Sequence, residues 1–398
     1  MTSPKVASLT GTNSLPNKTA ATPKRVLLIF GTRPEAIKLC PLVGTLRNIS
    51  FNVHLEPVVC VTGQHREMLD QVLEIFGVRP DFDLAIMQQG QTLPELTARL
   101  LQALPPVLEK VQPSLTIVQG DTTTTLCGAL AAFYAGIPVA HVEAGLRTFN
   151  FRSPFPEEMN RVLATRLTTL HFAATSGAAD HLLREGVPPA SIQVTGNTGI
   201  DAVLAVRDRL EAGTHSGLTV PLDPARKLIV VTAHRRESFG HGFEKICRAI
   251  AQLADRADVQ IVWPVHRNPN VLKPVDALLR GHPNITLIDP LEYLPFVDLM
   301  RRAYLIITDS GGVQEEAPSL GKPVLVLRDT TERPEAVAAG TVRLVGTDPA
   351  KIVAESLYLL DNPAEYRRMS EVHNPYGDGQ ACGRITQAIA SHLSIPLP

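Results

Sequence analysis

The chain has 398 residues, of which 44% are hydrophobic and 19% charged, and its 38 basic and 39 acidic side chains leave a formal net charge of −1. This is the composition of a soluble globular protein of two domains, because a single hydrophobic core stops growing beyond about 250–300 residues. A net charge near zero gives no field to hold a nucleic acid, and no apolar run reaches the roughly 18 residues of a membrane helix, so neither is an expected partner.

Residues 1–24 are rich in Ser, Thr, Pro and Asn and lack the apolar segment of a signal peptide. We therefore expect a disordered N-terminal extension. The five cysteines of the chain are odd in number, scattered, and without CxxC spacing. They indicate reduced thiols and a cytoplasmic location.

From Arg25 onward, short β-branched runs alternate with stretches of helical periodicity. The expected strands of the first half cover residues 25–30, 57–63, 115–121, 137–144, 170–175 and 192–197. These runs are apolar on both faces, which is typical of a parallel sheet covered by helices on each side. Residues 25–197 are therefore predicted to form a doubly wound, Rossmann-like α/β domain.

The same pattern restarts after the polar stretch 211–227. Its expected strands cover residues 228–234, 259–266, 285–290, 304–310, 323–328 and 342–346. They predict a second Rossmann-like domain over 198–373, and the final segment 374–398 is expected to form a helix that packs back on the first domain. Two doubly wound domains place the carboxyl ends of both sheets around one cleft, where such folds bind ligands.

Cations follow strands in both halves. Arg33 and Lys38 lie one helical turn apart just after the first strand, in a helix for which Thr32 is a plausible cap. Arg328 and Arg333 follow a strand of the second half. We interpret these side chains as ligands of one anion in the cleft; the alternative is a set of ordinary surface cations.

Carboxylates and a histidine stand at other strand ends. Asp121 and Glu143 end neighbouring strands of the first half, His234 ends a strand of the second, and Glu157 belongs to "PFPEEMNR". Carboxylates gathered near a diphosphate would raise one another's pKa while cations lower it, as acid–base work requires. The alternatives are a helix cap for Asp121, an exposed loop for His234, and a solvated salt-bridge loop over 141–161.

A "SGG" turn follows another strand of the second half. Ser310, Gly311 and Gly312 open a helix that carries Glu316. Glycine lets a backbone approach phosphate closely, and the free N–H groups of a helix start attract anions. A carboxylate in the first turn could accept hydrogen bonds from both hydroxyls of a ribose. The alternative is an ordinary tight turn before a helix.

The sequence lacks the common motifs that bind nucleotide cofactors. There is neither GxGxxG nor GxxxxGK[ST], so no hydride cofactor and no P-loop are implied. "DFD" at 81–83 spells a DxD metal motif but is expected to lie in a solvated loop. We expect no metal and no cofactor.

Together, "GTRPEAIK", "GDTTTT", "HVEAGLRT", "PFPEEMNR", "TGNTGIDA", "TAHRRESFG", "YLPF" and "TDSGGVQEEAPSLGKPVLVLRDTTERPEA" resemble the bacterial non-hydrolysing UDP-N-acetylglucosamine 2-epimerases, from about Arg25 to the C-terminus. The resemblance implies a glycosyltransferase-B-like fold with a UDP-binding C-terminal domain, and a homodimer. It implies interconversion of UDP-N-acetylglucosamine (UDP-GlcNAc) and UDP-N-acetylmannosamine (UDP-ManNAc) for surface polysaccharides. The implied mechanism eliminates UDP across C1 and C2 to enzyme-bound 2-acetamidoglucal and adds it back, with no metal or NAD.

The resemblance also implies residue roles. The diphosphate would be bound by Arg33, Lys38, His234, Ser310, Gly311, Gly312 and Arg333. The ribose would be held by Glu316, and the uracil pocket would contain Phe296 and Leu291, the latter where the family often has Gln. The catalytic groups would be Asp121, Glu143, Glu157 and His234, with the base that removes the C2 proton left open. A regulatory site for a second UDP-GlcNAc would involve Gln64, Arg235 and His266, although Glu67 stands where such members can carry Gln.

Three rival functions stay open at this point. A glycosyltransferase of the same fold would need an acceptor groove, which the sequence does not clearly show. A catalytically silent UDP-sugar sensor would be expected to lose the carboxylates. A hydrolysing epimerase, which lets water reach the glycal, differs too little to be excluded by one sequence.

Overall fold

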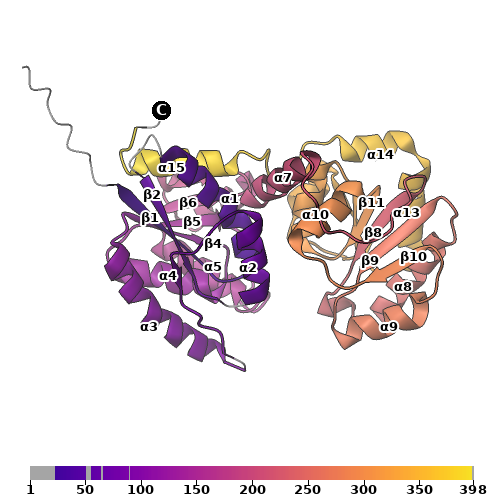
Figure 1. Ribbon diagram of the computed structural model, residues 1–398, viewed down its shortest axis with the longest axis horizontal. Coiled ribbons are helices and arrows are strands. Elements are labelled where there is room, and N and C mark those ends of the chain that lie inside the picture. The colour runs from indigo at the N-terminus through magenta and orange to yellow at the C-terminus, as the bar shows by residue number, and fades with distance from the viewer. Residues whose placement is uncertain (1–22, 51–54, 64–65, 89, 397–398) are drawn as a thin grey trace, which may run out of the picture.

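The computed structural model describes residues 23–50, 55–63, 66–88 and 90–396. The expected N-terminal extension 1–24 therefore lies outside the described residues except for its last two, and Lys24 already begins the first strand. Two α/β halves lie side by side, with helix α7 (Thr198–Glu211) between them (Figure 1).

The first half is built on a seven-stranded sheet in the order β3-β2-β1-β4-β5-β6-β7, with every neighbouring pair parallel. The strands are β1 (Lys24–Phe30), β2 (Leu55–Val61), β3 (Phe82–Asp83), β4 (Leu115–Gln119), β5 (Val139–Ala144), β6 (Leu170–Ala173) and β7 (Ile192–Val194). All six expected strands are present. The seventh, β3, falls on "DFD", where the expected loop is wrong: this segment pairs with β2 at the sheet edge, and the Val59 amide donates to Asp81 (2.8 Å).

Helices cover both faces of this sheet (Figure 1). They are α1 (Arg33–Ser50), α2 (Arg66–Ile75), α3 (Leu93–Val111), α4 (Thr123–Tyr134), α5 (Glu157–Leu167), α6 (Ser176–Arg184) and the 3-10 helix η1 (Pro189–Ser191). Strand β1 does not alternate between apolar and polar residues, because both of its faces are covered. Val26 and Leu28 pack in the cluster that contains α1, whereas Leu27 and Ile29 pack with α3 and α4. Both faces of the strand are buried, as in other parallel sheets.

The second half repeats this plan with a six-stranded parallel sheet in the order β10-β9-β8-β11-β12-β13. Its strands are β8 (Lys227–Thr232), β9 (Val259–Pro264), β10 (Ile285–Ile288), β11 (Leu305–Thr308), β12 (Val324–Val326) and β13 (Val342–Leu344). Each lies inside a predicted strand or begins one residue before it. The prediction of two doubly wound domains is confirmed.

The second half carries its own helices, and the chain then returns to the first half. They are η2 (Arg236–Ser238), α8 (His241–Ala254), α9 (Pro269–Leu279), α10 (Tyr293–Arg302), α11 (Gly311–Glu316), η3 (Ala317–Leu320), α12 (Pro334–Ala339), α13 (Pro349–Asp361), α14 (Pro363–Ser370) and α15 (Ala381–His392). The last of these, α15, packs on α1 and α7 (Figure 1). Asp201 of α7 accepts hydrogen bonds from the first two amides of α15.

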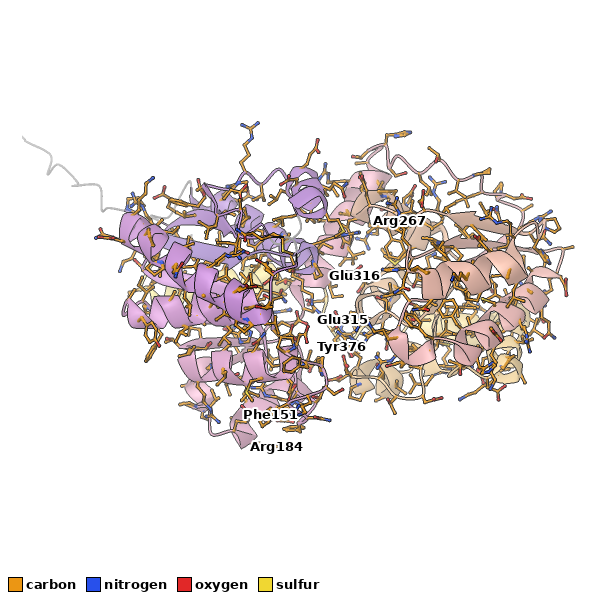
Figure 2. All side chains as sticks on the ribbon, turned by 90° about the horizontal axis from the view of Figure 1, so that it is seen from below. Phe151, Arg184, Arg267, Glu315, Glu316 and Tyr376 are labelled. Carbon is orange, nitrogen blue, oxygen red and sulfur yellow. The ribbon has the colours of Figure 1, made fainter. Side chains whose placement is uncertain are left out.

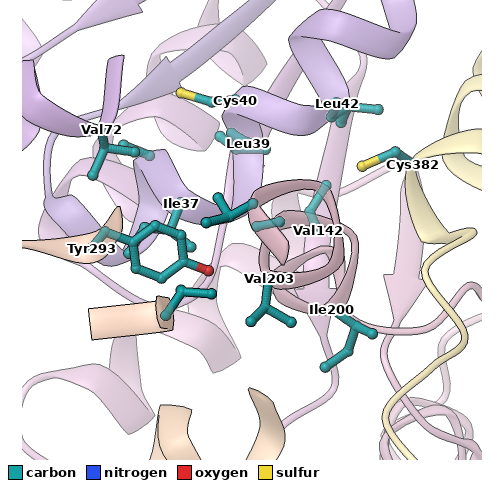
Figure 3. Packing of buried hydrophobic residues seen from close by; sticks show 14 of the residues in the cluster. Ile37, Leu39, Cys40, Leu42, Val72, Val142, Ile200, Val203, Tyr293 and Cys382 are labelled. Carbon is teal, nitrogen blue, oxygen red and sulfur yellow. The ribbon is translucent and has the colours of Figure 1, made fainter. Parts of the chain in front are cut away.

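One apolar cluster runs across the seam between the halves. Helix α7 packs on α1 and α15 on one side and on α10 and α11 on the other. Figure 3 shows Tyr293 of α10 beside Ile37 and Val72 of the first half. This shared core fixes how the two sheets face each other. Within the described part of the chain, no helix is long and apolar enough to cross a membrane.

Candidate active site

Many of the predicted site residues meet where the strand order of each sheet reverses. In the first half this point lies between β1 and β4, and in the second half between β8 and β11, the positions at which doubly wound folds bind ligands. A crevice of about 730 Å³ lies there and is lined from both halves, and a smaller pocket of about 180 Å³ adjoins it. Of the predicted residues, the crevice contains Arg33, Lys38, Asp121, Glu143, His234, His266 and Arg333.

Glu35 fixes the loop that presents Arg33. Its buried carboxylate accepts hydrogen bonds from the amides of Gly31 (3.0 Å) and Thr32 (2.7 Å), and from the hydroxyl of Thr122 (2.6 Å). The Thr122 contact ties the loop after β1 to the loop after β4. Sequence reasoning missed Glu35, although its spacing from Thr32 is that of a capping box.

Glu143 is the most constrained carboxylate of the site. It lies at the end of β5, where the register with β6 shifts, and its φ of 64° is in the left-handed region. Such a backbone costs a non-glycine residue about 1–3 kcal/mol, and a bulge re-aims a side chain. The Oε2 atom accepts hydrogen bonds from both Lys38 and Gln119. Burial raises the pKa of Glu143, and the Lys38 ammonium opposes that rise.

Asp121 lies on the neighbouring loop, after β4. Its Oδ2 is 3.7 Å from Arg161, and the Asn160 amide donates to its backbone carbonyl (2.9 Å). Burial raises the pKa of Asp121, Arg161 lowers it, and Glu157 raises it again. Asp121 therefore has the raised proton affinity expected of an acid–base group.

Some of the charged residues in the segment 141–161 stabilise the fold, and others lie near the site. Glu158 is buried, accepts from the amides of Thr148 (3.0 Å) and Phe149 (2.9 Å), and pairs with Arg161 (2.9 Å). Arg147 is likewise held inside the fold, by Glu185 at 2.6 Å. The expected alternative of a solvated salt-bridge loop is wrong for these buried groups. Glu157, one residue before Glu158, is half-buried in the first turn of α5.

In the second half, Asp309 organises the end of β8. This buried carboxylate accepts from the amides of His234 and Arg235, both at 2.7 Å, and its other oxygen faces His234 Nδ1 at 3.3 Å. The His234 ring stacks on His266, with centroids 5.6 Å apart. Both imidazoles line the crevice and the smaller pocket, so His234 is oriented from behind by Asp309 while its ring faces the cavity.

Arg333 is held at the floor of the crevice by a buried network. Its Nε donates to Glu315 (2.7 Å), and the other Glu315 oxygen accepts from Asn197 (2.9 Å), the residue that caps α7. Figure 2 shows Glu315, Glu316 and Tyr376 where the two halves meet. Although burial raises the pKa of Glu315, the charges of Arg333 and Lys38 hold it below its usual value. The network therefore places a fixed cation between the halves.

Glu316 differs from Glu315 in its surroundings. Burial and the neighbouring charge of Glu315 raise its pKa to about 8, while Lys38 and Arg33 oppose the rise. Within the described residues no hydrogen bond engages its carboxyl group. A carboxyl group held in this state can accept from ligand hydroxyls, as expected for a ribose site.

The smaller pocket is largely apolar. Beside Arg33, His234, His266 and Ser310, it is lined by Pro264, Pro290, Leu291, Phe296 and Val313, among others. Apolar walls with a few polar groups at one rim are typical of sites for flat organic rings. Leu291 and Phe296, the two residues expected beside uracil, both line this pocket.

Some predicted residues lie elsewhere. Neither cavity is lined by Glu157, Arg235, Gly311, Gly312 or Glu316, and Gln64 lies outside the described residues. The prediction that Arg328 is a ligand of an anion in the cleft is wrong: Arg328 pairs with Glu237 at 2.6 Å and does not line the crevice. Across the described ranges, no three His, Cys, Asp or Glu side chains form a group that could hold a metal ion.

Sequence reasoning also missed Gln119 and Glu315. Gln119 could have been recognised from the sequence, because it is a long polar side chain at the end of a buried strand that otherwise holds Leu, Thr, Ile and Val. Glu315 could not have been, since its partners Arg333 and Asn197 come from distant parts of the chain.

Comparisons with known proteins place the chain among relatives of one family. A family model described as UDP-N-acetylglucosamine 2-epimerase matches residues 47–390. The UDP-N-acetylglucosamine 2-epimerase of Escherichia coli (strain K12) is 58% identical over 374 residues, which cover 92% of this chain and 99% of that protein. A crystal structure of UDP-GlcNAc 2-epimerase from Neisseria meningitidis bound to UDP-GlcNAc matches with a TM-score of 0.85 and 48% identity, covering 92% of this chain and 100% of that one.

The fold extends beyond these relatives. A crystal structure of the glycotransferase of kitacinnamycin matches with a TM-score of 0.64 at 15% identity, covering 94% of this chain and 100% of that one. At this identity the likeness concerns the fold alone. The expected glycosyltransferase-B-like fold is confirmed.

Proposed function

Because this chain belongs to the UDP-N-acetylglucosamine 2-epimerase family, we propose that it interconverts UDP-GlcNAc and UDP-ManNAc by eliminating UDP and adding it back. One observation carries the proposal: two carboxylates of raised proton affinity, Asp121 and Glu143, share a crevice with Arg33 and Arg333, cations from opposite halves. The carboxylates supply proton transfer, and the cations receive the leaving diphosphate.

The nucleotide would lie mainly against the second half. Uracil suits the apolar pocket of Leu291 and Phe296, and the ribose hydroxyls would donate to Glu316. The diphosphate would then lie between Arg33 and Arg333, near His234 and the amides of the turn Ser310, Gly311 and Gly312. Leu291 offers no side-chain hydrogen bond to uracil, so recognition there would rest on packing and backbone groups.

The chemistry follows from the substrate. No carbonyl activates the C2–H bond of the sugar, so UDP must leave as a base removes the proton: the C–H electron pair forms the C1–C2 double bond, and the C1–O pair departs with UDP. In the return step, a proton reaches the other face of C2 and the diphosphate oxygen attacks C1. Asp121, Glu143 and Glu157 would share these proton transfers, in an order that the proposal leaves open. Neither the elimination nor the re-addition transfers a hydride, so the proposed mechanism requires no hydride acceptor.

Several wider expectations stay proposals. The family resemblance suggests a homodimer, and the exposed apolar residues Phe133 and Tyr134 of α4 and Met159 and Leu163 of α5 offer a face for a second copy. A cytoplasmic location fits the five buried cysteines, none of them in a disulfide. Supply of a surface polysaccharide pathway, and a regulatory role for Gln64, Arg235 and His266, rest on the resemblance alone.

Product analysis tests the proposal. Incubation of the chain with UDP-GlcNAc, followed by NMR in the presence of EDTA and without nicotinamide nucleotides, should give a mixture of UDP-GlcNAc and UDP-ManNAc. Free N-acetylmannosamine with UDP would instead identify a hydrolysing epimerase. Product formation only on addition of an acceptor would identify a glycosyltransferase and overturn the proposal.

A further inference from the structure

The two oxygens of the Glu143 carboxylate have different surroundings. Oε2 accepts from Lys38 of α1 and from Gln119 of β4. Oε1 receives no hydrogen bond from the part of the chain that the structure describes. Since Glu143 lines the crevice, one oxygen is held by the protein and the other is left for a ligand.

The two donors approach along paths that leave them little freedom. Gln119 is buried, ends β4, and belongs to the strand that pairs with β5 beside Glu143. The Lys38 side chain is 16% exposed and passes Gly199 of α7, where an added Cβ would lie 3.7 Å from Lys38 Cε. Its ammonium is therefore directed at Glu143, whereas the family resemblance had implied a contact with the diphosphate.

We infer that Lys38 and Gln119 are positioning residues for Glu143: Lys38 keeps its carboxylate ionised, and Gln119 fixes its direction, so that Oε1 faces the sugar. The inference rests on the proposed epimerase function and adds to it. Gln119 has no other assigned role in the site. Lys38 acts on the acid–base group rather than on the leaving group.

The charges around Glu143 support these two separate roles of Lys38 and Gln119. Asp121 follows β4, Glu315 belongs to α11, and both raise the pKa of Glu143 on top of the effect of burial; Lys38 lowers it. Arg333, which precedes α12, also interacts with Glu143. Gln119 is uncharged and can direct the group without altering the charge balance. Removing Lys38 should therefore make Glu143 clearly harder to ionise, whereas removing the neutral Gln119 donor should have a smaller effect on its ionisation.

The test compares pH profiles of turnover with UDP affinity. In Lys38→Met, the acidic limb of the kcat profile should move up by about 1–3 pH units, the usual effect of one close opposite charge, and Lys38→Arg should restore it. UDP affinity, measured by calorimetry, should change little. In Gln119→Leu, the limb should move up less than in Lys38→Met, while kcat falls by up to about 10²-fold, the loss expected when a reacting group is misaligned.

Gln119→Glu examines the same charge balance with Lys38 intact. A second carboxylate beside Glu143 should raise the acidic limb, as like charges do. This variant decides the question if Lys38→Met fails to fold, which circular dichroism and the stoichiometry of UDP binding would reveal.

Opposite results would overturn the inference. A Lys38→Met protein that binds UDP about tenfold more weakly or worse, with its acidic limb unmoved, would show a phosphate ligand instead. A Gln119→Leu protein with wild-type kcat, or a Gln119→Glu protein with an unshifted limb, would remove Gln119 from the site. Failure of the proposed function is separate, because it would appear in the wild-type protein as an absence of epimerisation or of deuterium uptake at C2.

Discussion

The guanidinium of Arg333 lies directly against Gly311, so that a Cβ atom added at Gly311 would stand 2.7 Å from Arg333 Cζ. The glycine at the start of α11 thus makes room for a cation that comes from a later loop. This contact joins the "SGG" turn to the "ERPEA" segment and holds the Arg333 side chain in the crevice.

We expect Gly311→Ala to displace Arg333 or the start of α11 and to destabilise the protein by about 1–3 kcal/mol, the usual cost of overpacking. Gly312→Ala is the matched control, since an added Cβ there meets nothing within 4 Å. It should be neutral or stabilising by up to about 1 kcal/mol, because alanine favours a helix over glycine. Thermal unfolding compares the two variants. Equal melting temperatures would contradict the packing argument.

If Arg33 and Arg333 together form a clamp that binds the diphosphate, UDP should bind more weakly to Arg33→Ala and to Arg333→Ala. Each charge-assisted contact should be worth about 1.5–3 kcal/mol, measured by isothermal titration calorimetry. Arg328→Ala is the control: this arginine is buried, but it pairs with Glu237 and lines neither cavity. If Arg328→Ala lost as much affinity as the other two, the clamp would be misplaced.

The raised pKa of Glu316 predicts that UDP binding releases a proton from its carboxyl group. Its pKa of about 8 leaves the carboxyl group mostly protonated near pH 7, and hydrogen bonds from the ribose hydroxyls favour the ionised form. Calorimetry at pH 7 in buffers of different ionisation enthalpy should detect more protons released by the wild-type protein than by Glu316→Gln. The difference should vanish well above pH 8, where the group is already ionised. Equal release by both proteins at pH 7 would argue against a contact between Glu316 and the ribose.

The same pKa affects stability. Because the folded-state pKa lies above the ordinary value of 4.5, the contribution of Glu316 to stability is fully present below about pH 4.5 and is lost as the pH rises through about 8. Glu316→Gln should therefore gain stability relative to the wild-type protein on the alkaline side. Urea unfolding of both proteins between pH 6 and pH 9 measures this change.

Substitutions at the neighbours Glu157 and Glu158 should have different effects, one on stability and the other on turnover. Glu158→Gln removes the closer of the two carboxylates that pair with the buried Arg161 and leaves only Asp121 at 3.7 Å; breaking a buried ion pair costs about 3–5 kcal/mol. Glu157→Gln should keep the melting temperature but lower turnover by about 10²–10⁴-fold, the usual contribution of an acid–base group. Full activity of Glu157→Gln would remove Glu157 from the proposed mechanism.

Much of this molecule could be predicted from local patterns. Buried parallel strands have apolar runs, so both sheets were found, and polar residues at strand ends led to Asp121, Glu143 and His234. What could not be predicted depended on distant partners. Arg328 pairs with Glu237, and Lys38 pairs with Glu143. Sequence spacing cannot reveal such pairs, because the loops that carry them meet only after both halves have folded.

The reason for Gly311 was also hidden in the sequence. We interpreted it as room for a phosphate, but its backbone conformation is an ordinary one and the nearest group is the Arg333 side chain. At Glu143 the backbone is unusual, with a positive φ, and no sequence pattern predicted it. Such a strained residue in a cavity is a structural sign of function.

The central claim is that the C2–H bond breaks during elimination of UDP, and NMR of the products formed in D2O tests it most directly. The account predicts that UDP-GlcNAc and UDP-ManNAc both acquire deuterium at C2, because the proton held by a crevice carboxylate exchanges with solvent before it returns. Glu143→Gln should nearly abolish this exchange while UDP still binds. Epimerisation without deuterium at C2 of either sugar would contradict the elimination mechanism.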